Sequence, residues 1–382
     1  MKKEWERKTL DEVCDFQRGL TYAKSDEVDI SDNIVLRAHN IDLATNLLNF
    51  NELKYISDEV VVPEAKKIKK NSLMICTASG SKTHLGKVAF IDDDYGYAFG
   101  GFMGLLTPRN GILPKYLFHL MTSGDYKDFI RSLSDGANIN NLKFDDLKRF
   151  PIPLPPLPEQ RRIVAVLDEA FAGLATAQAN AETNLQNARA LFESHLHGVF
   201  SMRGKGWVET TLEETCEMYQ PKTIGTKDLV PNGQFPVFGA NGIIGRYDKF
   251  NHEEPQLLVT CRGATCGAVN ISESKSWITG NAMVIRPKDA KIDLHFLEFF
   301  FRGGIDISRA ITGAAQPQIT RTNLNPLVIH FPQSISEQKQ IAERCDALST
   351  ETRRLTIIYS RKLAALAALK KSLLHQAFSG EL

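Results

Sequence analysis

The most constraining feature of this sequence is a pair of long segments of equal length. Glu159-Gln160 begins one predicted helix, which ends at residues 196–201, and Glu337-Gln338 begins another, which ends at residues 374–379. The segments are offset by 178 positions at both ends (337 − 159 and 379 − 201), so neither has gained or lost a residue. One inserted residue turns a helix face by about 100° and adds about 1.5 Å, whereas a loop absorbs insertions. The equal lengths therefore predict two helices that act as spacers.

The regions ahead of these helices have diverged in length. Both begin with a tryptophan in a similar segment, but Trp5 lies 154 positions before Glu159 and Trp207 lies 130 positions before Glu337. We therefore predict four parts in the chain. They are a first head (residues 1–156), a central spacer helix (157–203), a second head (204–333) and a C-terminal spacer helix (334–382).

The two helices are predicted to pair with each other. Alternating steps of four and three residues from Ile341, and the same frame moved back to Ile163, select mostly apolar side chains, as in coiled coils. A helix of about 41 residues is about 60 Å long, so its apolar face needs a partner of equal length. We expect an antiparallel pair rather than two helices that dock separately onto their own heads. The predicted coiled-coil and subunit interface consists of Glu159, Gln160, Ile163, Leu167, Leu174, Leu191, Glu337, Gln338, Ile341, Leu348, Leu355, Leu366 and Leu373.

The heads are predicted to be mixed α/β domains that share a weaker repeat. Residues 77–88 resemble residues 260–269, and each segment reads as a strand, a glycine-rich turn and a second strand. A helix is expected over residues 114–133 in the first head and from residue 294 to about residue 301 in the second. The predicted fold class is α+β: two mixed α/β domains joined by two long helices that pair as an antiparallel coiled coil, with a pseudo-twofold repeat.

Local charge indicates an anionic partner although the net charge is only +1. Residues 65–91 contain six lysines and no acidic residue, and residues 307–336 contain two arginines and no acidic residue. Such asymmetry in a neutral protein suits a basic face for nucleic acid. A lysine run that is simply solvated is an equal alternative on this evidence.

Several polar side chains on predicted loops have the chemistry that reads DNA bases. Asn reads adenine and Arg reads guanine in the major groove, each through two hydrogen bonds. The same Asn and Gly residues also form turns without any ligand. The candidate DNA-binding residues are Arg37, His39, Asn40, Lys82, His84 and Lys87 in the first head and Asn241, Arg246, Arg262, Gln316 and Arg321 in the second.

Catalytic and metal-binding motifs are missing from the sequence. The closest cysteine pair, Cys261 and Cys266, has no histidine at zinc-site spacing, so we expect free thiols. Residues 80–83 resemble the end of a phosphate-binding loop, but Ile75 replaces its first glycine. Residues 99–104 resemble a methyl-donor loop, but the Asn/Asp-Pro-Pro-aromatic motif of amino-methyltransferases is absent. We therefore predict a protein that is not an enzyme and holds no metal or cofactor.

The sequence also contains no targeting or membrane signal that we recognise. Residues 1–7 lack the apolar core of a signal peptide, and no apolar run approaches the length of a membrane span. We expect a cytoplasmic protein without a membrane partner.

The whole pattern resembles the specificity subunits of type I restriction–modification enzymes. The signature is the stretch Pro-Leu-Pro-Pro-Leu-Pro-Glu-Gln at residues 153–160, which leads into an apolar helix and recurs more loosely at residues 336–342. The two tryptophan starts, the two Phe-Ser helix ends and the order head, helix, head, helix fit as well. The second junction departs from the pattern, because residues 331–336 replace the proline-rich stretch.

This resemblance implies that each head is a target-recognition domain for one half of a bipartite, asymmetric double-stranded DNA site, and that the helices set the half-site spacing. It implies two methyltransferase subunits as partners, which bind S-adenosylmethionine and methylate adenine, and two restriction subunits that use ATP and Mg²⁺. The chain itself would hold none of these cofactors. The competing interpretation is a non-catalytic coiled-coil adaptor whose heads bind other proteins.

Overall fold

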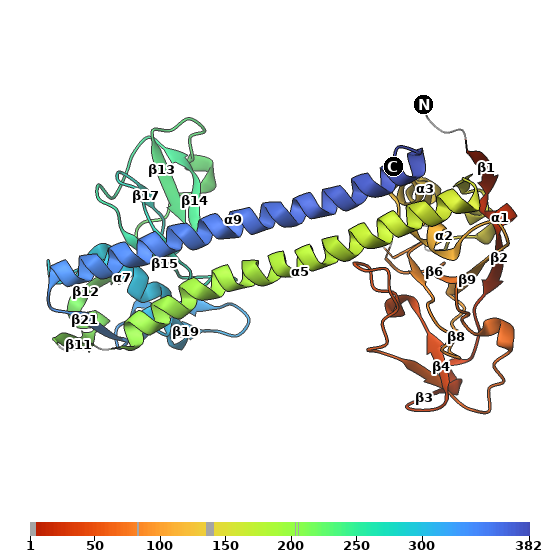
Figure 1. The fold of residues 1–382 in the computed structure, drawn as a ribbon. Coiled ribbons are helices and arrows are strands. Elements are labelled where there is room, and N and C mark those ends of the chain that lie inside the picture. Colours follow the sequence, from red (N-terminus) through yellow and green to blue (C-terminus); the bar gives the residue numbers. More distant parts are fainter. Residues whose placement is uncertain (1–4, 82–83, 135–140, 203, 205) are drawn as a thin grey trace. The chain divides into compact units, whose positions relative to one another are not determined.

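The computed structural model describes residues 5–81, 84–134, 141–202, 204 and 206–382. The chain divides into two compact units, one made of Met1–Asn180 with Lys362–Leu382 and the other of Ala181–Arg361. Each unit holds one head and parts of both long helices (Figure 1). Within the described residues, no helix combines the length and the apolar character that crossing a membrane requires.

Within its described residues, the first head contains three small sheets, four short α-helices and three 3₁₀ helices. Its short helices are α1 (Leu10–Val13), α2 (Pro114–Leu120), α3 (Gly124–Ser134) and α4 (Phe144–Leu147). In spatial order, its sheets are β1 (Glu6–Thr9) with β10 (Pro151–Leu154); β2 (Cys14–Arg18), β9 (Met103–Pro108), β6 (Leu73–Cys76) and β7 (Val88–Phe90); and β3 (Glu27–Val28), β5 (Lys54–Ile56), β4 (Asn33–Leu36) and β8 (Ala98–Phe99).

The second head repeats this plan and adds a small hairpin. Its short helices are α6 (Leu212–Thr215), α7 (Leu294–Phe299), which continues into a π-helical turn (Phe300–Gly304), and α8 (Arg321–Leu324). In spatial order, its sheets are β11 (Trp207–Thr211) with β21 (Val328–Pro332); β12 (Cys216–Tyr219), β18 (Ala282–Pro287), β15 (Leu257–Thr260) and β16 (Val269–Ile271); β14 (Gly242–Tyr247), β13 (Phe235–Gly239) and β17 (Trp277–Ile278); and the hairpin β19 (Ile311–Thr312) with β20 (Gln318–Ile319).

The pairing directions confirm that the two heads share one topology. β4 pairs antiparallel with β5 and parallel with β8, just as β13 pairs antiparallel with β14 and parallel with β17. The four-stranded sheets β2-β9-β6-β7 and β12-β18-β15-β16 are likewise antiparallel throughout. The fold class expected from the sequence, two mixed heads and two long helices, is therefore confirmed.

Two details of the predicted heads are wrong. The sequence match aligned Thr77 with Thr260, but the hydrogen bonds from Gly86 N to Cys76 O and from Gly267 N to Thr260 O make Cys76 the partner of Thr260. The turn is three residues longer in the first head. The sequence match aligned Thr77 with Thr260 because both are threonines, although the two positions are not equivalent. The single helix expected over residues 114–133 is interrupted between α2 and α3, where Ser123 Oγ accepts a hydrogen bond from Tyr126 N. Serine and glycine at this point favour a new helix start over continuation.

The long helices, α5 (Leu157–Ser201) and α9 (Ile335–Ser379), have 45 residues each and keep the 178-residue offset at both ends. In the first unit, Ile163 and Leu167 near the start of α5 share a core with Leu374 and Phe378 near the end of α9. The start of one helix therefore meets the end of the other, which is the antiparallel arrangement (Figure 1).

The second unit repeats this arrangement with the helices exchanged. Ala342 and Cys345 near the start of α9 share a core with Leu196 and Phe200 near the end of α5. Each long helix is thus anchored at both of its ends in a packed core.

The predicted heptad frame fits the first part of α5 and then drifts. Ile163, Leu167 and Ala181 are buried, but Leu191 is 51% exposed and Phe192 packs in its place against Phe299. An α-helix has 3.6 residues per turn, so a strict 3.5-residue frame rotates away by about 20° per heptad. Leu191, expected in the coiled coil, therefore faces outward, and Leu369, which lies 178 positions later, is also exposed.

Candidate nucleic-acid interface

The first head places Arg37 and His39 at a surface pocket of about 610 Å³, which we call the first-head pocket. Both residues follow strand β4. The pocket is also lined by Tyr22 and Lys24 after β2, and by Phe102 just before β9. The Arg37 side chain is half-buried, and its Nε is buried without a hydrogen-bond partner among the described residues. Three segments far apart in sequence thus contribute polar and aromatic groups to one concave surface.

Histidines add adaptable polar groups beside this pocket. Burial lowers the pKa of His39, and the charge of Arg37 lowers it further, while Glu52, 3.9 Å away, acts in the opposite direction. Burial also lowers the pKa of His84, and Lys87 and His39 add to this effect. Of these two histidines, His39 lines the first-head pocket. Neutral imidazoles, favoured by lowered pKa values, can donate and accept hydrogen bonds.

Asn40, predicted to read a base, has a structural role instead. It is 1% exposed, its Oδ1 accepts a hydrogen bond from Arg37 N at 2.7 Å, and its Nδ2 donates to the carbonyls of Asn49 and Glu52, both at 2.9 Å. Both amide hydrogens are therefore already used. An asparagine that is buried and saturated in this way cannot form the paired hydrogen bonds that recognise adenine.

Not every lysine of the predicted basic run is available at the surface. Lys87 is 8% exposed, its Nζ donates to Ile41 O at 3.0 Å, and burial lowers its pKa. Lys87, predicted to bind DNA, is instead held inside the first head by this hydrogen bond. Lys82 lies outside the described residues, so its predicted role stays a prediction.

In the second head, the turn after β15 is hydrogen-bonded to the segment that carries two further predicted residues. Arg262 on this turn is exposed, and its neighbour Gly263 donates from N to Pro317 O at 3.2 Å. This bond joins the turn to the segment that carries exposed Gln316, while exposed Arg321 begins α8 directly after β20.

Arg246 and Asn241 complete the predicted set in the second head. The Arg246 guanidinium donates to the carbonyls of Gly233 and Gln234, both at 2.6 Å, so it holds its own loop and is not a free base reader. Asn241 is exposed on the turn between β13 and β14, and its Oδ1 accepts a hydrogen bond from Asn270 Nδ2 at 3.2 Å.

Hydrogen bonds to the backbone show which residues of the two heads are equivalent. Gly100 N donates to Leu36 O, and Thr279 N donates to Phe238 O, both at 2.9 Å. Leu36 and Phe238 are therefore equivalent. The residues that follow them, Arg37 in the first head and Gly239 in the second, are equivalent as well.

The same comparison identifies a residue that the sequence analysis missed. Thr77 N donates to Phe102 O at 2.9 Å, and Cys261 N donates to Asn281 O at 3.1 Å, so Phe102 and Asn281 are equivalent. Phe102 is 73% exposed. The available signal was an aromatic residue after Gly100-Gly101, which we had considered as a methyl-donor loop.

Gln160, predicted for a subunit interface, instead holds the first head to α5. It is fully buried, its Oε1 accepts a hydrogen bond from Leu113 N at 2.8 Å, and its Nε2 donates to Gly111 O at 2.9 Å and Pro155 O at 2.8 Å. Its neighbour Glu159 forms an ion pair with Arg162 on the helix. The Gln160 amide therefore has no group left for a partner subunit.

Gln338 repeats these contacts in the second unit. It is fully buried, its Oε1 accepts from Asp293 N at 2.8 Å, and its Nε2 donates to the carbonyls of Lys291 and Pro332, both at 2.8 Å. The exposed residue Glu337 donates from its N to Ser334 Oγ, which caps α9. The repeated Glu-Gln pair thus marks a joint between head and helix.

The remaining predicted interface residues are largely covered within the chain. Ile163 and Leu167 are buried. The half-buried members are Leu174, Ile341, Leu348, Leu355, Leu366 and Leu373.

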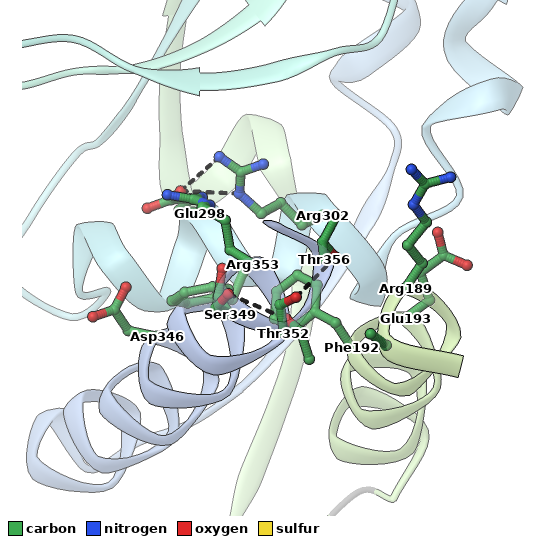
Figure 2. A pocket seen from close by; sticks show the side chains of 12 residues that line it. Arg189, Phe192, Glu193, Glu298, Arg302, Asp346, Ser349, Thr352, Arg353 and Thr356 are labelled. Atoms are coloured by element: carbon green, nitrogen blue, oxygen red, sulfur yellow. Dashed lines mark hydrogen bonds and ion pairs between the residues drawn. The ribbon is translucent and has the colours of Figure 1, made fainter. Parts of the chain in front are cut away.

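A pocket of about 330 Å³ lies in the second unit between the head and both long helices (Figure 2). Glu298 on α7 is bound by Arg302, with Oε1 2.8 Å from Nη2. Arg189 on α5 and Arg353 on α9 are exposed at its edge and have no ion-pair partner within the described part of the chain. Glu193 and Asp346 line the same pocket, so its lining carries charges of both signs.

The first unit has a pocket of about 430 Å³ at the corresponding junction. It is lined by Lys370 and Lys371 on α9 and by Lys127 and Arg131 on α3. Both head–helix junctions are therefore rich in basic side chains, although the individual residues differ.

The described residues contain no group of three or more His, Cys, Asp or Glu side chains that could hold a metal ion. All six cysteines are free, as expected. Burial raises the pKa of Cys14 to about 12 and the pKa values of Cys216 and Cys345 to about 11. These cysteines are therefore protonated thiols at neutral pH and poor nucleophiles.

Comparison with known proteins decides the family. A family model described as the type I restriction modification DNA specificity domain matches residues 2–184 and 204–358, once for each half of the chain. The chain belongs to the type I restriction–modification specificity family. It is thus a DNA-specificity subunit, the non-catalytic component of such a system.

Two relatives illustrate how far the sequence similarity extends. The StySPI specificity subunit of Salmonella potsdam is 26% identical over 425 residues, covering 99% of this chain and 89% of that protein. The EcoKI specificity subunit of Escherichia coli K12 is 33% identical over 181 residues, covering 47% of this chain and 38% of that protein.

Solved structures support the specificity-subunit fold. A chain from a type I R-M system, solved in work on its complex assembly and conformational transition, has a TM-score of 0.78 at 19% identity, covering 99% of this chain and 98% of that one. The HsdS subunit of Thermoanaerobacter tengcongensis has a TM-score of 0.60 at 19% identity, covering 99% and 97% of the two chains.

Proposed function

We propose that this specificity subunit reads a bipartite, asymmetric site in double-stranded DNA, with each head recognising one half. The observation that carries the proposal is that one scaffold presents two different sets of side chains. Arg37 and Phe102 in the first head correspond to Gly239 and Asn281 in the second, while the four-stranded sheets β2-β9-β6-β7 and β12-β18-β15-β16 pair in the same order. Two such readers suit two non-identical half-sites, since base-edge chemistry determines the sequence that is read.

We also propose that α5 and α9 set the distance between the half-sites. The anchors at both helix ends support this role. Gln160 and Gln338 hold the starts, and Phe200 and Phe378 lie in packed cores at the ends. A change in helix length would therefore displace an anchor, in agreement with the 178-residue offset that is equal at both helix ends. Dimeric DNA readers fix half-site spacing by comparable geometry.

Two methyltransferase subunits are the proposed partners on the long helices. Exposed apolar side chains on these helices support such docking, since apolar surface favours association. They are between 37% and 51% exposed and comprise Val166, Leu191, Ile357, Ile358 and Leu369. In this proposal the methyltransferases bind S-adenosylmethionine and methylate adenine, two restriction subunits use ATP and Mg²⁺, and the complex acts in the cytoplasm without a membrane partner.

A head exchange tests the proposed function. The full chain is expressed with its methyltransferase, and residues 1–156 are replaced by the first head of another family member. Methylome sequencing should show a change in one half-site, while the other half-site and the spacing are retained. A change in both half-sites would contradict independent reading by the two heads. Binding to the parental site should weaken steeply with added salt, because phosphate contacts release counterions.

A further inference from the structure

Phe102 combines a fixed backbone with an exposed ring. Its carbonyl accepts hydrogen bonds from Thr77 N at 2.9 Å, Ala78 N at 3.2 Å and Thr77 Oγ1 at 2.9 Å. Thr77 itself is 4% exposed, whereas Phe102 is 73% exposed. A phenyl ring in water loses the stabilisation that burial provides, and this backbone is held so that the ring points outward. The ring is therefore presented to something outside the chain.

Phe102 lines the first-head pocket together with Gly100 and Gly101. At Gly19, an added Cβ would lie 1.9 Å from Gly100 O, so the chain segments can meet here only because glycine occupies the position. At Gly101, an added Cβ would come within 3.2 Å of Thr21 Oγ1. The volume of the pocket, about 610 Å³, is large enough for a small planar molecule.

Two cationic side chains, Arg37 and Lys24, line the pocket. The Arg37 Nε is buried and has no hydrogen-bond partner among the described residues, and no ion pair engages Lys24 in that part of the chain. The acidic lining residue, Glu27, is occupied by an ion pair with Lys54. A buried donor without a partner is unfavourable unless a ligand supplies an acceptor. A planar group with hydrogen-bond acceptors, attached to a phosphate backbone, meets all of these requirements.

We infer that the first-head pocket takes an unstacked nucleobase from the first half-site, with Phe102 stacking at its edge and Arg37 donating to the base. This inference rests on the proposed function. A base pair within a stacked duplex presents only its edge, and a concave pocket cannot reach it, so the base must leave the stack. Apolar side chains act as wedges at such steps. Asn281 and Gly239 hold the equivalent positions in the second head, so the inference concerns the first half-site alone.

The experiment uses the full chain in complex with its methyltransferase and a duplex that carries the site found by methylome sequencing. 2-Aminopurine is placed in turn at each position of the first half-site. With the wild-type complex, its fluorescence should rise at one position, because unstacking relieves quenching. A mismatch at that position should tighten binding, since the pairing energy no longer has to be overcome, whereas mismatches elsewhere should weaken it.

Variants then connect this position to the pocket. Phe102→Ala should abolish the fluorescence rise and weaken binding roughly 5- to 100-fold, the range expected for loss of one aromatic stack. Phe102→Trp should retain both properties. Arg37→Met should relax base discrimination at the same position. Asn281→Ala, the matched control in the second head, should leave the first half-site signal unchanged.

Two results would overturn the inference. One is wild-type affinity and fluorescence in Phe102→Ala, which should fold normally because the ring is exposed. The other is full affinity in Phe102→Leu together with weaker binding when a thymine is replaced by uracil. That pattern would mean that residue 102 touches a thymine methyl group in a stacked duplex. Failure of the wild-type complex to bind any bipartite site would instead remove the proposed function, and the inference with it.

Discussion

The two heads are joined to the long helices in the same way and differ in the side chains they expose. Gln160 and Gln338 make equivalent sets of hydrogen bonds. In contrast, Phe102 and its counterpart Asn281 have nothing in common chemically. The joints carry the fold and must persist, while the exposed loop residues carry little packing and are free to vary. Under the proposed function, this difference would let one framework serve two specificities.

A second contrast lies where each head meets its helix. In the first unit, His119 Nε2 and Lys115 Nζ bind the two carboxylate oxygens of Asp168, at 2.8 and 2.6 Å. In the second unit, Asp346 occupies the position 178 residues later and lines a pocket with Phe299. The contact between head and helix is therefore partly electrostatic in the first unit. In the second unit, an aromatic ring lies beside an acidic residue instead.

The largest expected effect comes from the helix ends. Phe378 packs edge-on against Tyr116 in the first unit, and Phe200 packs in the same way against Phe296 in the second. Phe378→Ala and Phe200→Ala should each destabilise their own unit by about 3–5 kcal/mol, the usual result of truncating a buried phenylalanine. Hydrogen exchange read by mass spectrometry would locate the loss. Leu191→Ala is the matched control and should change stability by less than about 0.5 kcal/mol. Loss of protection in the opposite unit would refute these anchors.

The buried glutamines should give the next largest effect. Gln160→Ala leaves the amide of Leu113 and two carbonyls without partners, and Gln338→Ala does the same in the second unit. Each change should cost about 2–4 kcal/mol, since buried groups that lose their partners pay for desolvation. Chemical unfolding of the full chain measures this cost, with exposed Gln186→Ala as the control. Clearly unequal losses would show that the two joints are not equivalent.

Base reading by the second head should produce a smaller effect. Arg262→Ala should cost about 1–3 kcal/mol at one base pair of the second half-site and leave the first half-site unchanged. Competition binding with singly substituted duplexes measures this directly. Arg246→Ala removes an arginine that holds its own loop. This variant should therefore lower the stability of the second head. A uniform loss of affinity on every sequence in Arg262→Ala would mean that this residue contacts phosphate.

The smallest effect concerns pH. Burial lowers the pKa of His119 below 6.5, although Asp168 acts against this, so the folded state resists a proton that the unfolded state accepts. The stability that this provides is present above pH 6.5 and declines as the pH falls below it.

Asp168 extends this trend at lower pH. Burial alone would raise its pKa, but hydrogen bonds from Lys115 and His119 outweigh burial, and the net pKa lies below 3.8. Its contribution is therefore lost as the pH falls through this lowered value. His119→Phe introduces the residue type that the second unit has at position 299. In this variant, thermal unfolding of the first unit should no longer show the decline in stability below pH 6.5. An unchanged pH profile in this variant would exclude His119 as its source.

The repeat in the sequence predicted both helices well because an inserted or deleted residue in either helix would have changed the offset between them. The 178-residue offset appears in the structure as two 45-residue helices. The heptad frame failed at Leu191 because a real helix turns faster than a 3.5-residue period. Neighbouring Phe192 takes the packed position.

The candidate site was harder to predict because residue type does not reveal exposure. Asn40 and Lys87 have the right chemistry for DNA, yet the fold uses both internally. Phe102 was missed because an exposed aromatic cannot be told from a core aromatic in a single sequence. Gln160 was assigned to a surface although its amide satisfies backbone groups in the interior.

The most direct test of the central claim, that helix length sets the half-site spacing, is a matched pair of four-residue insertions, one after Ala181 in α5 and one after Tyr359, 178 positions later in α9. Four residues add about 6 Å and nearly restore the helix face, which corresponds to about two base pairs at about 3.4 Å each. A two-residue insertion at each point, which turns the face by about 200°, should abolish assembly and serves as the control. Methylome sequencing of cells with both four-residue insertions should show the same half-sites separated by a longer spacer. An unchanged spacer with full activity would mean that the helices do not set the distance.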